Sequence, residues 1–248
     1  MKRLRLSGTR RAAPWMATVV ALGLASVAQA DTITLVRDKG ANGYSGDNGG
    51  GEMGVSVFTG APVVAMGAAA QVSGSYFQTF CLEKNSFFTP GENYQWTLSG
   101  AAQNGGVGGQ TSPGSDPISS ATAWIYTQFY FAHLNGYDYT LGSGRKASAT
   151  ELQLAIWYLE NEISTLVSGS QSAAWVSQAI EATDGDGYLD DWAGGMGGVR
   201  VLTITDASGT DKQDQLFMVP LPPAAFMGFG GLAGLGLVGY LRRRRNST

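Results

Sequence analysis

Cys81 and His133 are the only cysteine and the only histidine of the chain, and a thiol beside an imidazole can perform nucleophilic catalysis. In such a site the histidine takes the thiol proton and a third group orients the ring, a role open to Asp138 or Asn135. His133 follows an aromatic run, where a structural histidine at a helix end is the commoner case. We therefore expect no enzyme, with a Cys–His hydrolase as the less favoured alternative.

Acidic residues and glycines alternate between Asp184 and Asp191, as they do in calcium-binding loops. Aligned on Gly187, such a loop would open at Ala182 and close at Ala193, where acidic ligands are required. A solvated turn is the simpler interpretation, and calcium stays an alternative. The sequence contains neither a zinc-type His/Cys cluster nor a phosphate-binding glycine loop followed by lysine, so we predict no metal and no cofactor.

The N-terminus has the three parts of a secretory signal peptide. Five basic residues precede an apolar run over residues 15–27, and Ala28-Gln29-Ala30 provides small residues for cleavage. The apolar run is short for a membrane span, which disfavours a retained anchor. We predict a signal peptide over residues 1–30, removed on export.

The C-terminus pairs a proline motif with a short apolar segment and a basic end. Residues 224–241 carry no charge, so they predict a transmembrane helix whose basic end stays in the cytoplasm. The motif and the basic end consist of Val219, Pro220, Leu221 and Pro222, and of Arg242, Arg243, Arg244 and Arg245.

This order of features in residues 219–248 resembles the PEP-CTERM sorting signals, in the Val-Pro-Leu-Pro-Ala variant. Leu221 replaces the Glu of the commoner form, and Pro223 replaces the Ala of the variant. The resemblance implies that an exosortase at the inner membrane processes the tail and passes the protein to the cell surface or extracellular matrix. A plain C-terminal anchor is the alternative.

The exported part, residues 31–218, is strongly acidic. Nine of the 16 Lys and Arg lie in the two ends, so this part carries seven against all 19 Asp and Glu, a net charge of −12. Such a charge repels phosphate backbones and argues against nucleic acid as a partner. Its length suits one domain with its own core.

Short β-rich runs alternate with Gly, Asn and Ser, and a helical stretch lies among them. We predict strands over residues 32–37, 54–59, 75–82, 94–98, 199–205 and 215–219. A capping box, Ser148 with Glu151, predicts the start of a helix whose apolar residues follow at helical spacing. Further helices are expected at 119–133 and 172–182. The fold class is α+β, a β-rich sandwich or barrel with an inserted helical subdomain.

Three short runs make this domain resemble the thioester domains of bacterial surface adhesins, known for a Thr-Gln-x-Ala motif. They are Phe80-Cys81-Leu82-Glu83, Gln153-Leu154-Ala155-Ile156-Trp157 and Lys212-Gln213-Asp214-Gln215-Leu216-Phe217. Leu152 stands in place of the motif's Thr, and Lys212 in place of an apolar residue. The resemblance implies a bond between the cysteine sulfur and the side-chain carbonyl of a late glutamine. Gln213 is the expected partner of Cys81 and Gln215 the second choice, with Gln153 and Trp157 shaping the pocket.

A thioester of this kind stores an electrophile, since a thiolate leaves more readily than an amide nitrogen. An amine on a surface ligand would displace the sulfur and become covalently attached, provided that an apolar pocket including Phe80, Phe87 and Trp157 excludes water. We expect covalent adhesion to an amine-bearing ligand or surface polysaccharide. A passive matrix protein with a buried, inert Cys81 is the alternative.

Overall fold

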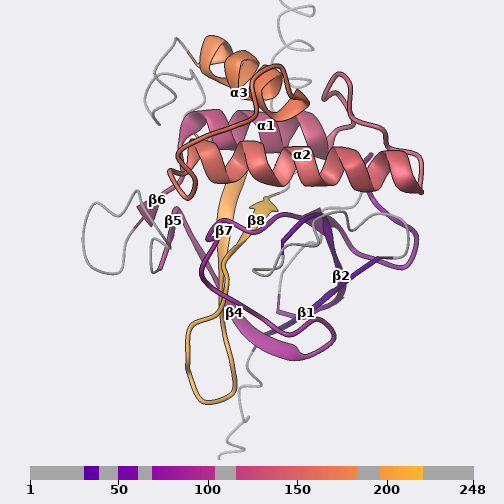
Figure 1. The fold of residues 1–248 in the computed structure, drawn as a ribbon. Helices are drawn as coiled ribbons and strands as arrows, with labels where there is room; N and C mark the ends of the chain where they lie inside the picture. The colour runs from indigo at the N-terminus through magenta and orange to yellow at the C-terminus, as the bar shows by residue number, and fades with distance from the viewer. Residues whose placement is uncertain (1–30, 39–49, 61–68, 104–115, 184–195, 220–248) are drawn as a thin grey trace, which may run out of the picture.

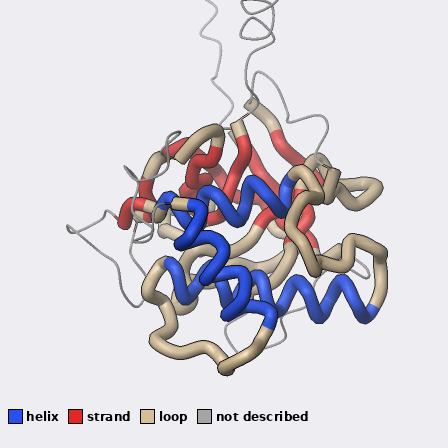
Figure 2. The backbone as a smooth tube through the Cα atoms, turned by 90° about the horizontal axis from the view of Figure 1, so that it is seen from above, coloured by secondary structure: helices blue, strands red, loops and turns tan. Residues whose placement is uncertain are grey.

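The computed structural model describes residues 31–38, 50–60, 69–103, 116–183 and 196–219. These residues form an α+β fold in which three helices gather on one side of an antiparallel sheet (Figure 1). Seen from above, the helices and the strands again occupy separate halves of the molecule (Figure 2). The fold class predicted from the sequence is confirmed at this level.

Six strands form the main sheet in the order β3-β2-β1-β4-β7-β8, and every pairing within it is antiparallel. Two short strands, β5 and β6, pair separately. The strands are β1 Thr32–Val36, β2 Met53–Phe58, β3 Gln78–Thr79, β4 Asn93–Ser99, β5 Ala101–Ala102, β6 Asp116–Pro117, β7 Val199–Thr205 and β8 Gln215–Met218.

The two edges of this sheet are joined by the segment that follows β3. Cys81 forms an antiparallel bridge with Gln215 of β8. Leu216 donates its N–H to the Phe80 carbonyl at 3.1 Å, and Leu82 donates to the Asp214 carbonyl at 3.0 Å. The strand pairings therefore run in a closed ring, and this closure brings two segments far apart in the sequence together at Cys81.

The helices lie between β6 and β7 in the chain: α1 Ser120–Tyr130, α2 Ser143–Leu159 and α3 Gln171–Ala182. The predicted helices at 119–133 and 172–182 are confirmed, with a serine at each N-cap. Ser119 Oγ accepts the Thr122 N–H at 3.0 Å, and Ser170 Oγ accepts the Ala173 N–H at 3.2 Å. These bonds satisfy N–H groups that have no partner within the helix.

The predicted capping box at Ser148 and Glu151 is wrong, because α2 begins at Ser143, a full turn earlier. Ser148 Oγ instead accepts the N–H of Asp138 at 3.0 Å, and Glu151 accepts the N–H of Ser172 at the start of α3, at 2.9 Å. The first turns of α2 are held by Arg145, whose buried guanidinium is paired with Glu52. A tertiary contact thus extends the helix beyond its local start signal.

Aromatic side chains join the sheet to the helices in a common core. Phe80, before Cys81, meets Phe129 of α1 edge to face, with ring centroids 5.0 Å apart. Tyr126 of α1 is fully buried and donates its hydroxyl to the Gln78 carbonyl of β3 at 2.8 Å. Burial of this kind supplies most of the folding free energy, and here it fixes α1 against the segment that carries Cys81.

No helix within the described ranges is both long and apolar enough to cross a membrane. The predicted signal peptide, residues 1–30, and the sorting signal beyond Val219 lie outside these ranges. Val219 itself donates its N–H to the Gly198 carbonyl at 2.8 Å.

Candidate functional site

Cys81 is fully buried where the two sheet edges meet. The hydrogen bonds of its neighbours, Leu216 to Phe80 and Leu82 to Asp214, make Cys81 and Gln215 a non-hydrogen-bonded antiparallel pair. In such pairs the Cα atoms are about 4.5 Å apart and the side chains are closest. The backbone therefore directs the Cys81 and Gln215 side chains toward each other.

The amide of Gln215 lies against the sulfur. Its Nε2 is 3.5 Å and its Oε1 is 3.8 Å from Cys81 Sγ. Nε2 also donates to the Gln213 carbonyl at 3.0 Å, which orients the amide. Burial raises the pKa of the Cys81 thiol to about 12, although the hydrogen bond with Gln215 lowers it in part. The group in this pocket is a neutral thiol beside a carboxamide.

Gln213, the expected partner of Cys81, lies two residues before Gln215, opposite Glu83 rather than opposite Cys81. It is buried, and its Nε2 donates to the carbonyl of Glu83. Gln213 and Gln215 share one face of the chain, but the register pairs Gln215 with Cys81. The geometry therefore favours Gln215, the second choice of the sequence analysis, as the residue that can react.

Gln153 of α2 holds the backbone of Cys81 from the other side. Its Oε1 accepts the N–H of Cys81 at 3.1 Å and that of Gly51 at 3.0 Å, and its Nε2 donates to the Cys81 carbonyl at 2.7 Å. The side chain is fully buried. A carboxamide is suited to this position because it both accepts and donates, and Gln153 therefore fixes the orientation of Cys81.

Trp157, one turn after Gln153 on α2, is also fully buried. Gly50 packs on its indole so closely that a Cβ there would lie 3.0 Å from Trp157 Cη2. Gly50 also has a φ of +107°, which favours glycine. The glycine-rich pattern around Gly50 does not predict this contact, which depends on the tertiary structure. Phe87, expected in the pocket lining, is instead about half exposed, at 52%.

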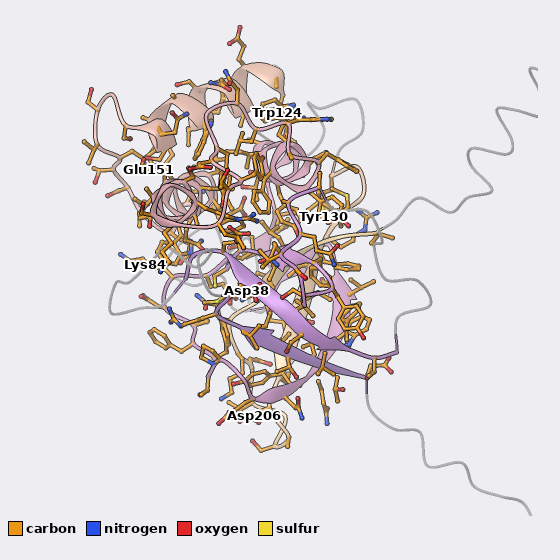
Figure 3. The ribbon with its side chains drawn as sticks, turned by 90° about the vertical axis from the view of Figure 1, so that its right-hand side faces the viewer. Asp38, Lys84, Trp124, Tyr130, Glu151 and Asp206 are labelled. Atoms are coloured by element: carbon orange, nitrogen blue, oxygen red, sulfur yellow. The ribbon has the colours of Figure 1, made fainter. Side chains whose placement is uncertain are left out.

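Several buried carboxylates lie near the pair. Glu83 Oε2 accepts the N–H of Asp214 at 3.0 Å, and Asp214 accepts the N–H groups of Gln103 at 2.8 Å and Ile204 at 3.1 Å. Burial, with the charge of Glu83, raises the pKa of Asp214 to about 8. Burial, with the charges of Glu160, Glu162 and Glu83, raises the pKa of Asp116 to about 7. Lys84, the residue after Glu83, lies between the helices and the end of the molecule where Asp206 is found (Figure 3).

These raised pKa values predict a domain that loses stability as the pH rises. Below pH 3.8 Asp116 and Asp214 are protonated in both the folded and unfolded states, whereas from there to about pH 8 the folded state retains protons that the unfolded state releases. We expect the melting temperature to be at least about 5 °C lower at pH 8 than at pH 5. Thermal unfolding monitored by circular dichroism across this range measures the slope.

Asp116→Asn should flatten this pH dependence, because the variant removes a carboxyl whose pKa burial and neighbouring carboxylates raise to about 7. The matched control is Glu181→Gln at an exposed position of α3. An unchanged slope in Asp116→Asn would contradict the role assigned to this carboxyl.

The structure places His133 on the surface after α1, beside the ring of Phe131, while Cys81 lies in the core. Asp138 accepts the N–H of Thr140, and the carbonyl of Asn135 accepts the indole N–H of Trp175. Cys81 thus contacts glutamine side chains, whereas His133, Asp138 and Asn135 make their contacts elsewhere. The acidic turn at 184–191 lies outside the described residues, and within those residues no cluster of His, Cys, Asp and Glu could hold a metal ion.

Comparisons with protein families, characterised proteins and solved structures find no significant match.

Proposed function

We propose that Cys81 and Gln215 form an internal thioester, which the exported protein uses to attach covalently to amines on a surface or matrix ligand. One observation carries the proposal: the Gln215 amide atoms lie 3.5 and 3.8 Å from Cys81 Sγ. Proximity of this kind greatly accelerates reaction between two groups.

The chemistry balances without an added reagent. Sγ bonds to the side-chain carbonyl carbon of Gln215, the bond from that carbon to Nε2 breaks, and the thiol proton leaves on the nitrogen as ammonia. In attachment, an amine nitrogen bonds to the same carbon and the sulfur leaves. Cys81 takes the amine's proton and is again a thiol.

The surroundings support a stored thioester. Cys81, Gln153 and Gln215 are fully buried, which limits hydrolysis before a ligand docks. Gln153 holds both backbone polar groups of Cys81, so the sulfur keeps its position.

Export and processing form the second part of the proposal, and they rest on the sequence of the two ends. A signal peptide over residues 1–30 and an exosortase-processed tail over 219–248 would carry the domain through the inner membrane to the cell surface or matrix. The acidic domain would meet an amine-bearing ligand, since protonated amines carry the opposite charge.

A passive matrix protein is the second candidate, and the complete burial of Cys81 favours it, because a buried thiol with a pKa near 12 is inert on its own. In this case the sulfur and the amide remain unreacted neighbours.

Intact mass of the purified protein separates the two candidates. With a thioester, the wild type is expected about 17 Da below the mass of the unreacted chain with the same termini. Cys81→Ala and Gln215→Ala should have no such deficit, whereas Gln95→Ala, on the exposed side of β4, should keep it. Methylamine should add about 31 Da to the wild type and release one thiol.

Hydrolysis of a formed thioester has its own signature. Water leaves glutamate at position 215, about 1 Da above the unreacted chain, which peptide mapping detects. A wild type with an unreacted Gln215 and a titratable Cys81 would refute the thioester and leave the passive protein.

A further inference from the structure

The register between residues 80–83 and β8 decides which glutamine faces the sulfur. Gln213 and Gln215 lie on the same face of the chain, so a slip by two residues would keep every side chain on its face and present Gln213 to Cys81. Burial of Leu216 and Phe217 favours the observed register, since a slip would move both out of the core. The alternation of side chains alone does not distinguish the two registers, so polar contacts beside Cys81 can add to the choice.

Glu83 and Gln213 supply these contacts. The Asp214 N–H is bonded to the Glu83 side chain at 3.0 Å, at the point where the ladder beside Cys81 ends. Gln213 Nε2 donates to the backbone carbonyl of Glu83, so each residue holds the strand of the other. Both side chains are almost fully buried, at 1% exposed each, where hydrogen bonds are strong and unmet ones are costly.

The contacts depend on the observed register. After a two-residue slip, the amide of Gln213 would lie opposite Cys81 and would no longer reach the Glu83 carbonyl, and the residue opposite Glu83 would be Asp211, whose carboxylate cannot donate to that carbonyl. The Asp214 carboxylate would also lose its bond from the Ile204 N–H of β7 if β8 moved.

We propose that Glu83 and Gln213 are positioning residues that lock this register and so select Gln215, not Gln213, as the glutamine that joins Cys81. The inference deepens the proposed function and rests on it for the chemistry, while the register itself can be measured independently of any thioester.

Disulfide trapping measures the register directly. In the full chain, Gln215→Cys is expected to oxidise with Cys81 in the presence of oxidised glutathione, because a non-hydrogen-bonded pair suits disulfide geometry. Gln213→Cys removes the Gln213 contact but keeps the Glu83 bond to the Asp214 N–H, and it should cross-link at least about fivefold less. Adding Glu83→Ala should lower the first cross-link and raise the second. Glu83→Gln, which retains an Oε1 acceptor, should restore the original preference.

Thioester yield gives the second readout. Glu83→Ala and Gln213→Ala are each expected to lower the fraction of chains that have lost ammonia by at least about fivefold. The melting temperature of each variant is recorded alongside, and Glu83→Gln should recover the yield. A loss of fold without a change of register would lower both cross-links together, whereas the lock predicts that they change in opposite directions.

Two results would overturn the inference: equal cross-linking of Gln215→Cys with and without Glu83→Ala, or failure of Glu83→Gln to restore it. If the wild type lacks a thioester while the cross-links still depend on Glu83, the proposed function fails and the lock stands. If the wild type has a thioester that is insensitive to Glu83, the function stands and the lock fails.

Discussion

Gln153→Glu is expected to abolish the loss of ammonia and to lower the melting temperature by roughly 10 °C. In the wild type, Nε2 of Gln153 donates to the Cys81 carbonyl at 2.7 Å, and a carboxylate would place an acceptor against that acceptor. The position is fully buried, so the new charge would also lack solvation. Differential scanning calorimetry and intact mass measure the two effects.

The matched control is Gln95→Glu, the same change at an exposed position of β4, which should leave both quantities unchanged. Protonation relieves the charge, so the stability deficit of Gln153→Glu should shrink as the pH falls toward 4. A variant with the wild-type melting temperature and the full mass deficit would show that Gln153 does not hold Cys81.

Arg145→Met is expected to lower the free energy of unfolding by about 3–5 kcal/mol, because it removes the cation paired with a fully buried carboxylate. Arg145 Nε donates to the two Glu52 carboxylate oxygens at 3.2 and 2.9 Å, and Tyr137 donates its hydroxyl to Glu52 at 2.7 Å. Glu52 directly follows Gly50 and Gly51, which contact Trp157 and Gln153. A displaced Glu52 should therefore also disturb these contacts and reduce thioester formation.

The double variant Glu52→Gln with Arg145→Met should recover much of the lost stability, since neither partner is then left as a buried charge. Lys146→Met, the neighbouring exposed cation of α2, is the control. Burial already raises the pKa of Glu52 against the opposing effect of Arg145, so removing Arg145 should raise it further. The deficit should therefore be smaller at pH 5 than at pH 7, and an equal effect of Lys146→Met and Arg145→Met would contradict the assignment.

Local signals predicted the elements of this fold well where side chain and backbone interact within a few residues. Ser119 and Ser170 cap their helices through N–H groups three residues ahead. The start of α2 was missed because its first turns depend on the contact between Arg145 and Glu52, which are 93 residues apart in the chain. Strand β3 is shorter than its apolar run because the chain leaves β2 after Thr79 and continues along β8.

The sequence by itself determined which residue types were available for chemistry: one cysteine, a helix with Gln153 and Trp157 one turn apart, and two glutamines, one just before the last strand and one at its start. Only the tertiary structure decided which glutamine faces the sulfur, because Cys81 and Gln215 are 134 residues apart and their pairing follows from the closure of the sheet. A rule based on local sequence pattern cannot distinguish two glutamines that lie on the same face of the chain. They differ only in what lies across the strand, Cys81 for Gln215 and Glu83 for Gln213.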